Sequence, residues 1–258
     1  MQTIKINQAI RDLAKQKGLD LSPQGLAKFR EQVNKKDAAT INQYRYNVSK
    51  NFYYERSLVL DRNIFKNKFK NIKPTNSSLV DNAKKIKSLG EQFKKGEKFF
   101  VILQGKPGTG KTMLASALLN DISNNANPPI PCLFIDATRF RDLALAMNDF
   151  STAKERERNR YSQLQEDVKK AEIVLLDDLG SETSMNSTDI KNANETVQRA
   201  LFELTSMLQD KVLIITTNYG VKELHQMYNE KLLSRMLTTN QEHVIKFDNV
   251  PDYRLTMH

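Results

Sequence analysis

The sequence predicts an α/β protein in which a parallel sheet is flanked by helices, together with a small N-terminal region that is all helical. Short apolar runs alternate with segments of helical period, and a strand followed by a helix, repeated, is typical of a parallel sheet. The runs Val-Ile-Leu at 101–103 and Ile-Val-Leu-Leu at 173–176 are apolar at every position, as in strands that are buried on both faces. A glycine-rich loop joins one of these runs to a helical segment.

The alternating part begins after Pro74, where a lysine- and asparagine-rich stretch without a clear period ends. The expected strands are 99–104, 132–136, 173–177 and 212–216, and the expected helices are 78–94, 112–123, 139–148 and 192–208, before a last helical and strand segment. We therefore expect two domains, residues 1–60 and residues 61–258.

The N-terminal region shows apolar residues at helical spacing. A first helix is expected around residues 6–13, and Ser22 followed by Pro23 is typical of an N-cap and first turn opening a second. A third helical stretch carries Ile41, Tyr44, Val48 and Phe52. These side chains either pack three small helices together or, through their aromatic rings, stack on bases or on a partner protein.

Composition excludes several classes of protein. The chain has 258 residues and a net charge of +10, and its first 98 residues hold 22 Lys and Arg against 9 Asp and Glu. This asymmetry suggests a polyanion or an acidic protein surface as partner, but a solvated lysine-rich surface explains it equally well. One cysteine and three scattered histidines predict neither a disulfide nor a zinc site. No apolar run approaches the length that spans a bilayer, so we expect a cytoplasmic protein without a membrane partner.

The glycine-rich loop matches G-x-x-x-x-G-K-[ST] and lies between an expected strand and an expected helix, which is the context that its mechanism requires. In such a loop, backbone N–H groups surround phosphates, the lysine reaches the β and γ phosphates, and the hydroxyl binds Mg²⁺. The candidate cofactors are therefore ATP and Mg²⁺. The loop residues are Gly105, Lys106, Pro107, Gly108, Thr109, Gly110, Lys111 and Thr112.

Two carboxylates follow the buried strand 173–177. In ATPases with this loop, the first acidic residue at that place holds the magnesium shell, which predicts Asp177 as a metal-site residue together with Thr112. Asp178 is then placed to orient or deprotonate the attacking water. Glutamate is more usual at this place, so the shorter side chain predicts slow hydrolysis.

Three further residues are candidates for contact with the γ-phosphate. Asn218 follows the strand 212–216 at the edge of the sheet where ligands gather in open α/β folds. Arg235 and Arg254 are the arginines that we expect to touch phosphate, although from composition alone a surface salt bridge explains either one.

The order of these motifs resembles AAA+ ATPases of the DnaC/DnaI helicase-loader group, bacterial or phage. The resemblance covers roughly residues 60–258 and rests on the glycine loop, Asp-Asp-Leu-Gly-Ser-Glu at 177–182, Thr-Thr-Asn at 216–218 and Leu-Ser-Arg-Met at 233–236. The Asp-Asp-Leu-Gly-x-Glu stretch is closer to the DnaI-like branch. By this resemblance Asn218 is the sensor I residue, Arg235 the arginine finger acting on the adjacent subunit, and Arg254 the sensor II residue.

The resemblance also implies partners. It implies a hexameric replicative DNA helicase gripped by the N-terminal domain, single-stranded DNA, and self-association through the ATP sites. The helix near 138–147 is then associated with DNA, with Arg139 and Arg141 as candidates, whereas we expect the charged stretch 154–160 to be a solvated, mobile loop. The N-terminal part lacks the cysteines of zinc-bearing loader domains.

Two other functions stay open at this stage. One is a transposition ATPase of the IstB type, which acts on duplex DNA. The other is an ATP-gated adaptor with negligible turnover. This possibility stays open because Asp178 stands where a glutamate is more usual.

Overall fold

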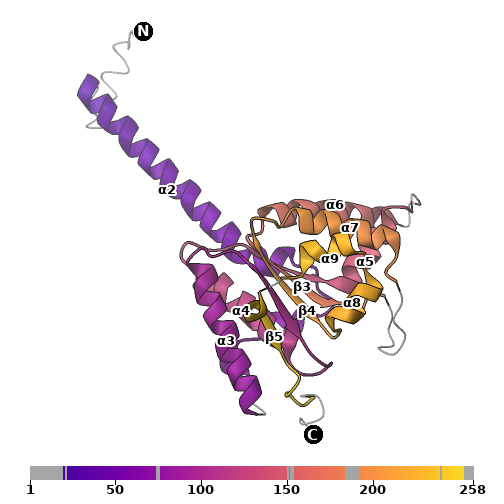
Figure 1. Cartoon of the computed structure of the whole chain (residues 1–258). Helices are drawn as coiled ribbons and strands as arrows, with labels where there is room; N and C mark the ends of the chain where they lie inside the picture. Colours follow the sequence, from indigo (N-terminus) through magenta and orange to yellow (C-terminus); the bar gives the residue numbers. More distant parts are fainter. Residues whose placement is uncertain are drawn as a thin grey trace. The chain divides into compact units, whose positions relative to one another are not determined.

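The computed structural model describes residues 20, 22–73, 76–149, 151, 154–183, 192–238 and 240–252 (Figure 1). Contacts along the chain cluster into two units, residues 1–48 and residues 49–258. Residues 49–60, placed by the sequence with the N-terminal domain, lie in the second unit. The first expected helix, residues 6–13, lies outside the described residues.

A single helix, α2 (Pro23–Arg56), replaces the separate second and third helices that the sequence predicted. Its start agrees with the expected N-cap, because Ser22 Oγ accepts a hydrogen bond of 3.0 Å from the backbone N–H of Gly25. The helix continues because residues 35–40 contain neither glycine nor proline. An i,i+4 ion pair of 2.7 Å between Lys35 and Glu31 further supports it.

The second unit is built on a five-stranded sheet with the order β2-β3-β4-β1-β5, in which every neighbouring pair is parallel. This confirms the predicted fold class. The strands are β1 (Phe100–Gln104), β2 (Cys132–Asp136), β3 (Ile173–Leu179), β4 (Val212–Thr217) and β5 (Val244–Lys246).

Helices cover both faces of the sheet (Figure 1). One face packs against α3 (Ser77–Lys94) and α4 (Lys111–Asn125), through side chains such as Val101 and Leu103 of β1. The other face packs mainly against four helices, α5 (Ala137–Ala146), α6 (Glu155–Lys170), α7 (Glu195–Ser206) and α9 (Glu230–Met236). The remaining described elements are α8 (Val221–Met227), η1 (Arg62–Lys66), η2 (Phe69–Asn71) and η4 (Gln241–His243).

The charged stretch 154–160, expected to be a mobile loop, forms the start of α6, so that prediction was wrong. Its apolar residues Tyr161, Leu164 and Val168 follow at helical spacing and are buried in the core. Glu155 and Glu157 lie in the first turn and Lys169 and Lys170 in the last, where each charge sign is favourable to the helix dipole. The same charges that suggested a solvated loop therefore stabilise a helix.

The end of α2 belongs to the core of the second unit. Phe52 is 5% exposed and Tyr53 is fully buried, with the Tyr53 ring edge-on to those of Tyr54 and Phe65. The chain then reaches Leu58, whose N–H donates to Phe134 O (2.8 Å) and whose carbonyl accepts from Asp136 N (2.9 Å). The segment after α2 therefore pairs with the outer edge of β2.

This packing predicts very different costs for removing two tyrosines of the same helix. Tyr53→Ala should lower the free energy of unfolding by about 3–5 kcal/mol, because it leaves a cavity among buried rings. Tyr44 is 69% exposed, so Tyr44→Ala should change stability by less than about 0.5 kcal/mol. Urea unfolding followed by circular dichroism measures both; equal costs would show that residues 49–56 do not belong to the core.

Candidate nucleotide site

The glycine loop leaves β1 at Gln104 and enters α4 at Lys111, so the backbone N–H groups at the start of this helix face the loop. Gly108 has φ of 76°, a conformation that favours glycine. A Cβ at Gly108 would also lie 1.9 Å from Asp252 Oδ1, so a larger residue would require the Asp252 side chain to move. The Asp252 side chain therefore lies directly against the backbone of the loop.

Lys111 is 5% exposed and its ammonium group is held in place by three oxygens. Nζ donates to Gly105 O (2.6 Å), Lys106 O (2.7 Å) and Asn218 Oδ1 (2.8 Å). The third bond joins the loop to the end of β4. Lys111 and Asn218, which separate motifs predicted as residues of the nucleotide site, are therefore in direct contact.

Asn218 also reaches the second carboxylate, since its Nδ2 donates to Asp178 Oδ1 at 2.7 Å. Asp178 has φ of 58°, an uncommon value for a residue other than glycine, at an irregularity in the β3–β4 register between Leu176 and Leu179. Its N–H donates to Thr216 Oγ1 at 2.8 Å. The strained backbone and these two bonds direct the Asp178 carboxylate toward the Lys111–Asn218 pair.

Asp177 is 5% exposed and accepts two hydroxyl hydrogen bonds on Oδ1, from Thr112 (2.8 Å) and Thr216 (2.6 Å). Burial is the main cause that raises the pKa of Asp177 to about 7, and the charges of Asp178 and Asp136 act in the same direction. The two hydroxyl bonds oppose the shift. A nearby cation would favour the charged carboxylate, so Thr112 and Asp177 together form an oxygen pair suited to Mg²⁺.

Asp136 is a neighbour that the sequence analysis did not single out. It lies opposite Asp177 in the parallel register of β2 and β3, and its Oδ1 caps α5 by accepting from Arg139 N at 2.9 Å. Burial raises the pKa of Asp136 above its usual value, and the charge of Asp178 adds to this effect. The sequence signal was an aspartate that ends a strand directly before a helix.

Arg235 lies in the last turn of α9, and its guanidinium Cζ is 4.4 Å from the ring centroid of Phe202 on α7. Among the contacts of the described residues, none joins Arg235 to the glycine loop. Arg254 lies outside the described residues. Asp252, two positions earlier, borders a hollow of about 720 Å³ that Lys106, Pro107 and Thr109 also line.

Arg139 and Arg141, the candidate DNA contacts on α5, differ in their surroundings. Arg139 is exposed. Arg141 is engaged by Asp142 Oδ1, at 3.1 and 2.8 Å, and by the carbonyl of Glu182 at 3.2 Å.

Glu182 ends the Asp-Asp-Leu-Gly-Ser-Glu stretch and is buried. Its carboxylate accepts from the N–H of Gly180 at 2.8 Å and from the hydroxyl of Tyr228, the residue that follows α8. It therefore joins the loop after Asp178 to the α8–α9 segment. The sequence analysis quoted Glu182 in the motif but gave it no role, because its partner is 46 positions away.

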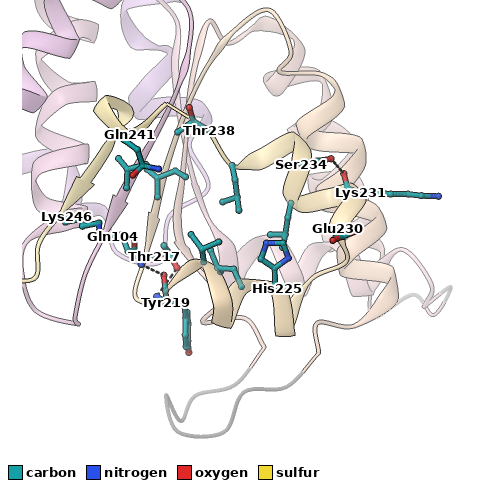
Figure 2. A pocket seen from close by; sticks show the side chains of 16 residues that line it. Gln104, Thr217, Tyr219, His225, Glu230, Lys231, Ser234, Thr238, Gln241 and Lys246 are labelled. Carbon is teal, nitrogen blue, oxygen red and sulfur yellow. Dashed lines mark hydrogen bonds between the residues drawn. The ribbon is translucent and has the colours of Figure 1, made fainter.

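A separate hollow of about 880 Å³ lies between α8, α9 and the β1–β5 edge of the sheet (Figure 2). Its polar lining includes Gln104, Thr217 and Tyr219, with Gln104 Nε2 donating to Tyr219 O at 3.1 Å. None of the residues 105–112 lines it. This hollow is therefore not the phosphate site.

The fold and the site together define a P-loop ATPase of the parallel-sheet type. The family model for the "ATPase family associated with various cellular activities (AAA)" matches residues 101–242, more than half of the chain. The chain belongs to this family. It is thus a nucleotide-binding ATPase, as the motifs predicted.

The fold is similar to solved structures of replication proteins. A structure described as a primosome component from Streptococcus pyogenes serotype M3 has a TM-score of 0.52 and 18% identity, over 78% of this chain and 94% of that one. The DnaC helicase loader has a TM-score of 0.52 and 19% identity, over 72% and 99%. DnaI has a TM-score of 0.52 and 16% identity, over 80% and 100%. The likeness to the DnaC/DnaI group is thereby confirmed for the fold.

No protein of curated function matches the sequence. None of the described helices is long and apolar enough to cross a membrane.

Glu182 predicts a pH-dependent contribution to stability. Burial raises the pKa of Glu182 above its usual value of 4.5, so the folded chain holds this proton more tightly than the unfolded chain. The contribution is therefore full below pH 4.5 and is lost as the pH rises through the folded pKa. We expect the free energy of unfolding of Glu182→Gln to fall less between about pH 5 and about pH 8 than that of the native chain.

Urea unfolding at several pH values measures this difference. The control is Glu97→Gln, a change at an exposed glutamate, which should keep the native pH dependence. A native pH profile for Glu182→Gln would contradict the assignment of a raised pKa.

Proposed function

We propose that this ATPase is an ATP-dependent helicase loader, which binds the hexameric replicative DNA helicase and delivers it onto single-stranded DNA during replication initiation. The observation that carries the proposal is the likeness of fold to a helicase loader over nearly the whole of that chain, combined with a continuous site from Lys111 through Asn218 to Asp178. The similarity to DnaI and to a primosome component supports the same process.

In this proposal the glycine loop binds the phosphates of ATP. Lys111, which now donates to two loop carbonyls, would bind the β and γ phosphates, and Thr112 and Asp177 would hold Mg²⁺. An ion held there would supply positive charge beside the phosphates. The residues fit this ion because the Thr112 hydroxyl and the Asp177 carboxylate lie 2.8 Å apart.

Asp178 is the residue that we assign to the attacking water. Its carboxylate is oriented by the Asn218 amide, which also contacts Lys111. Asn218 therefore connects the residue assigned to the water with the lysine assigned to the phosphates. An aspartate is one methylene shorter than the usual glutamate. We therefore propose slow basal hydrolysis that speeds up on assembly or on DNA.

Arg235 is proposed to act on the ATP of a neighbouring copy. Its position at the end of α9 supports this role, because the guanidinium stacks on Phe202 and forms no ion pair with any residue that the structure describes. Arg254, two positions after Asp252 in the chain, is proposed as the second phosphate-facing arginine. Self-association would then complete each site.

The N-terminal region is proposed to bind the helicase. On α2, Ile41, Tyr44 and Val48 are 51%, 69% and 46% exposed, and their spacing places them on one helix face. An exposed apolar stripe of this kind is typical of a protein-binding helix.

Two substitutions separate ATP binding from hydrolysis. Lys111→Ala should weaken ATP binding at least about tenfold, because a charged hydrogen bond to phosphate is lost. Asp178→Asn should leave binding nearly unchanged and lower kcat by about 100-fold or more, because the base is lost. Binding of a fluorescent ATP analogue and release of phosphate measure the two effects.

The control is Lys170→Ala, a change at an exposed lysine of α6 outside the glycine loop. It should bind ATP nearly as well as the native chain does. If Asp178→Asn keeps full activity in DNA and helicase assays, the chain is an ATP-gated adaptor in which turnover has no part.

The loader role predicts a complex with the replicative helicase of the source organism. Native mass spectrometry with and without ATP should show a stoichiometric complex for the full chain and none for residues 49–258. The deletion ends at residue 48 because Phe52 and Tyr53 belong to the core of the second unit. The shortened chain should still bind ATP.

The absence of any complex would contradict the loader role. ATP-dependent oligomers on duplex DNA would then favour a transposition ATPase of the IstB type.

A further inference from the structure

The positive charge of the chain is concentrated in one short segment of the second unit. Residues 62–98 hold 11 Lys and Arg against 3 Asp and Glu, which accounts for most of the net charge of +10. This segment forms η1, η2 and α3, and α3 packs beside α4 (Figure 1). Four of these lysines, Lys68, Lys70, Lys84 and Lys87, line one surface beside α3 and α4.

Two adjoining hollows lie in this surface and share Phe69 and Lys87. One has a volume of about 380 Å³ and the other about 230 Å³. We call them together the Phe69 groove. Besides the two shared residues, its lining comprises Lys68, Lys70, Ile72, Leu79, Val80, Ala83, Lys84, Ala117, Asn120, Asp121, Asn124 and Asn125. Phe69 is partly buried against the core, so its ring is anchored while part of it faces the groove.

The acidic residues near the groove are already paired. Asp81 pairs with Lys84 at 3.6 Å, and both Glu91 (3.0 Å) and Asp121 (2.6 Å) pair with Lys94.

In contrast, Lys68, Lys70 and Lys87 are exposed and form no ion pair with any residue that the structure describes. The surroundings of Phe69 thus carry an excess of uncompensated positive charge.

The geometry points to a binding groove for single-stranded nucleic acid, in which Lys68, Lys70 and Lys87 contact phosphates and a base stacks on Phe69. Proteins that bind single strands without sequence preference combine two features. Basic side chains contact the phosphates of the nucleic-acid backbone, and aromatic rings stack on the bases. A paired base within a duplex does not expose its face to such a ring. An acidic protein is less well matched, because lysine is depleted in the cores of protein interfaces.

This inference rests on the nucleic-acid part of the proposed function and names a surface for it. It differs from the contact on α5 that the family resemblance implies. The groove lies on the face of the sheet covered by α3 and α4, whereas α5 covers the opposite face.

The test is the binding of a fluorescently labelled oligothymidylate to the full chain, followed by anisotropy at several salt concentrations. The triple variant Lys68→Ala/Lys70→Ala/Lys87→Ala should bind at least about tenfold more weakly, and the slope of log affinity against log salt should fall by about 2, because about 0.7 is lost per phosphate contact. Phe69→Leu should weaken binding at least about fivefold and leave the slope unchanged, because stacking releases no counterions.

A charge-matched control removes three exposed lysines elsewhere, in the variant Lys36→Ala/Lys170→Ala/Lys222→Ala. It should bind the oligonucleotide nearly as well as the native chain does. Binding of a fluorescent ATP analogue by every variant confirms that each is folded. Native-like affinity and salt slope in the groove triple variant would overturn the inference.

Other outcomes overturn different parts of the proposal. If Arg139→Ala/Arg141→Ala abolishes binding while the groove triple variant retains it, DNA binding stands and the groove is wrong. If the native chain binds no oligonucleotide, both the groove and the nucleic-acid part of the proposed function fail. If it instead binds polyglutamate through the same lysines, the groove belongs to an acidic protein.

Discussion

The site depends on the parallel pairing of β1, β4 and β3. Parallel strands end at the same edge of a sheet, so the loop after β1, the polar tip of β4 and the carboxylates of β3 necessarily meet there. The register places Gln104 of β1 opposite Thr217 of β4, one position before Gly105 and Asn218 respectively. A shift by one residue would turn these side chains to the other face and separate Lys111 from Asn218.

Burying charge at this edge has a cost that hydrogen bonds offset only in part. Asp177 lies among the ends of three strands and is held by two threonine hydroxyls, yet burial still raises its pKa to about 7. Asp178 adds a left-handed backbone conformation at a register irregularity. Strain and buried charge of this kind persist because the surrounding apolar strands determine the backbone, and a bound cation would relieve the charge.

The loop after β3 connects the site with two helical regions on one face of the sheet. The carbonyl of Glu182 accepts from Arg141 of α5, and its buried carboxylate contacts Tyr228, which lies between α8 and α9. Asn229 then caps α9, the helix that carries Arg235, through a 2.9 Å bond to Leu232 N. A change at any one of α5, the Asp178 loop or α9 therefore affects the packing of the other two.

The sequence by itself determined the alternation of strands and helices, the parallel sheet and the chemistry of the loop. Strands that are apolar at every position, separated by segments of helical period, indicate a parallel sheet covered by helices on both faces. The spacing of Gly105, Lys111 and Thr112 is that of a phosphate-binding loop.

Tertiary structure alone decided the rest. The run 154–160 looked solvated because its charges dominate the pattern, but Tyr161, Leu164 and Val168 gain a buried surface only when α5 is beside them. Thr216 as a partner of Asp177, Tyr228 as a partner of Glu182, and Lys87 beside Phe69 all join residues that are separated in the chain. Such contacts are set by the packing of whole elements, which no local pattern of residues records.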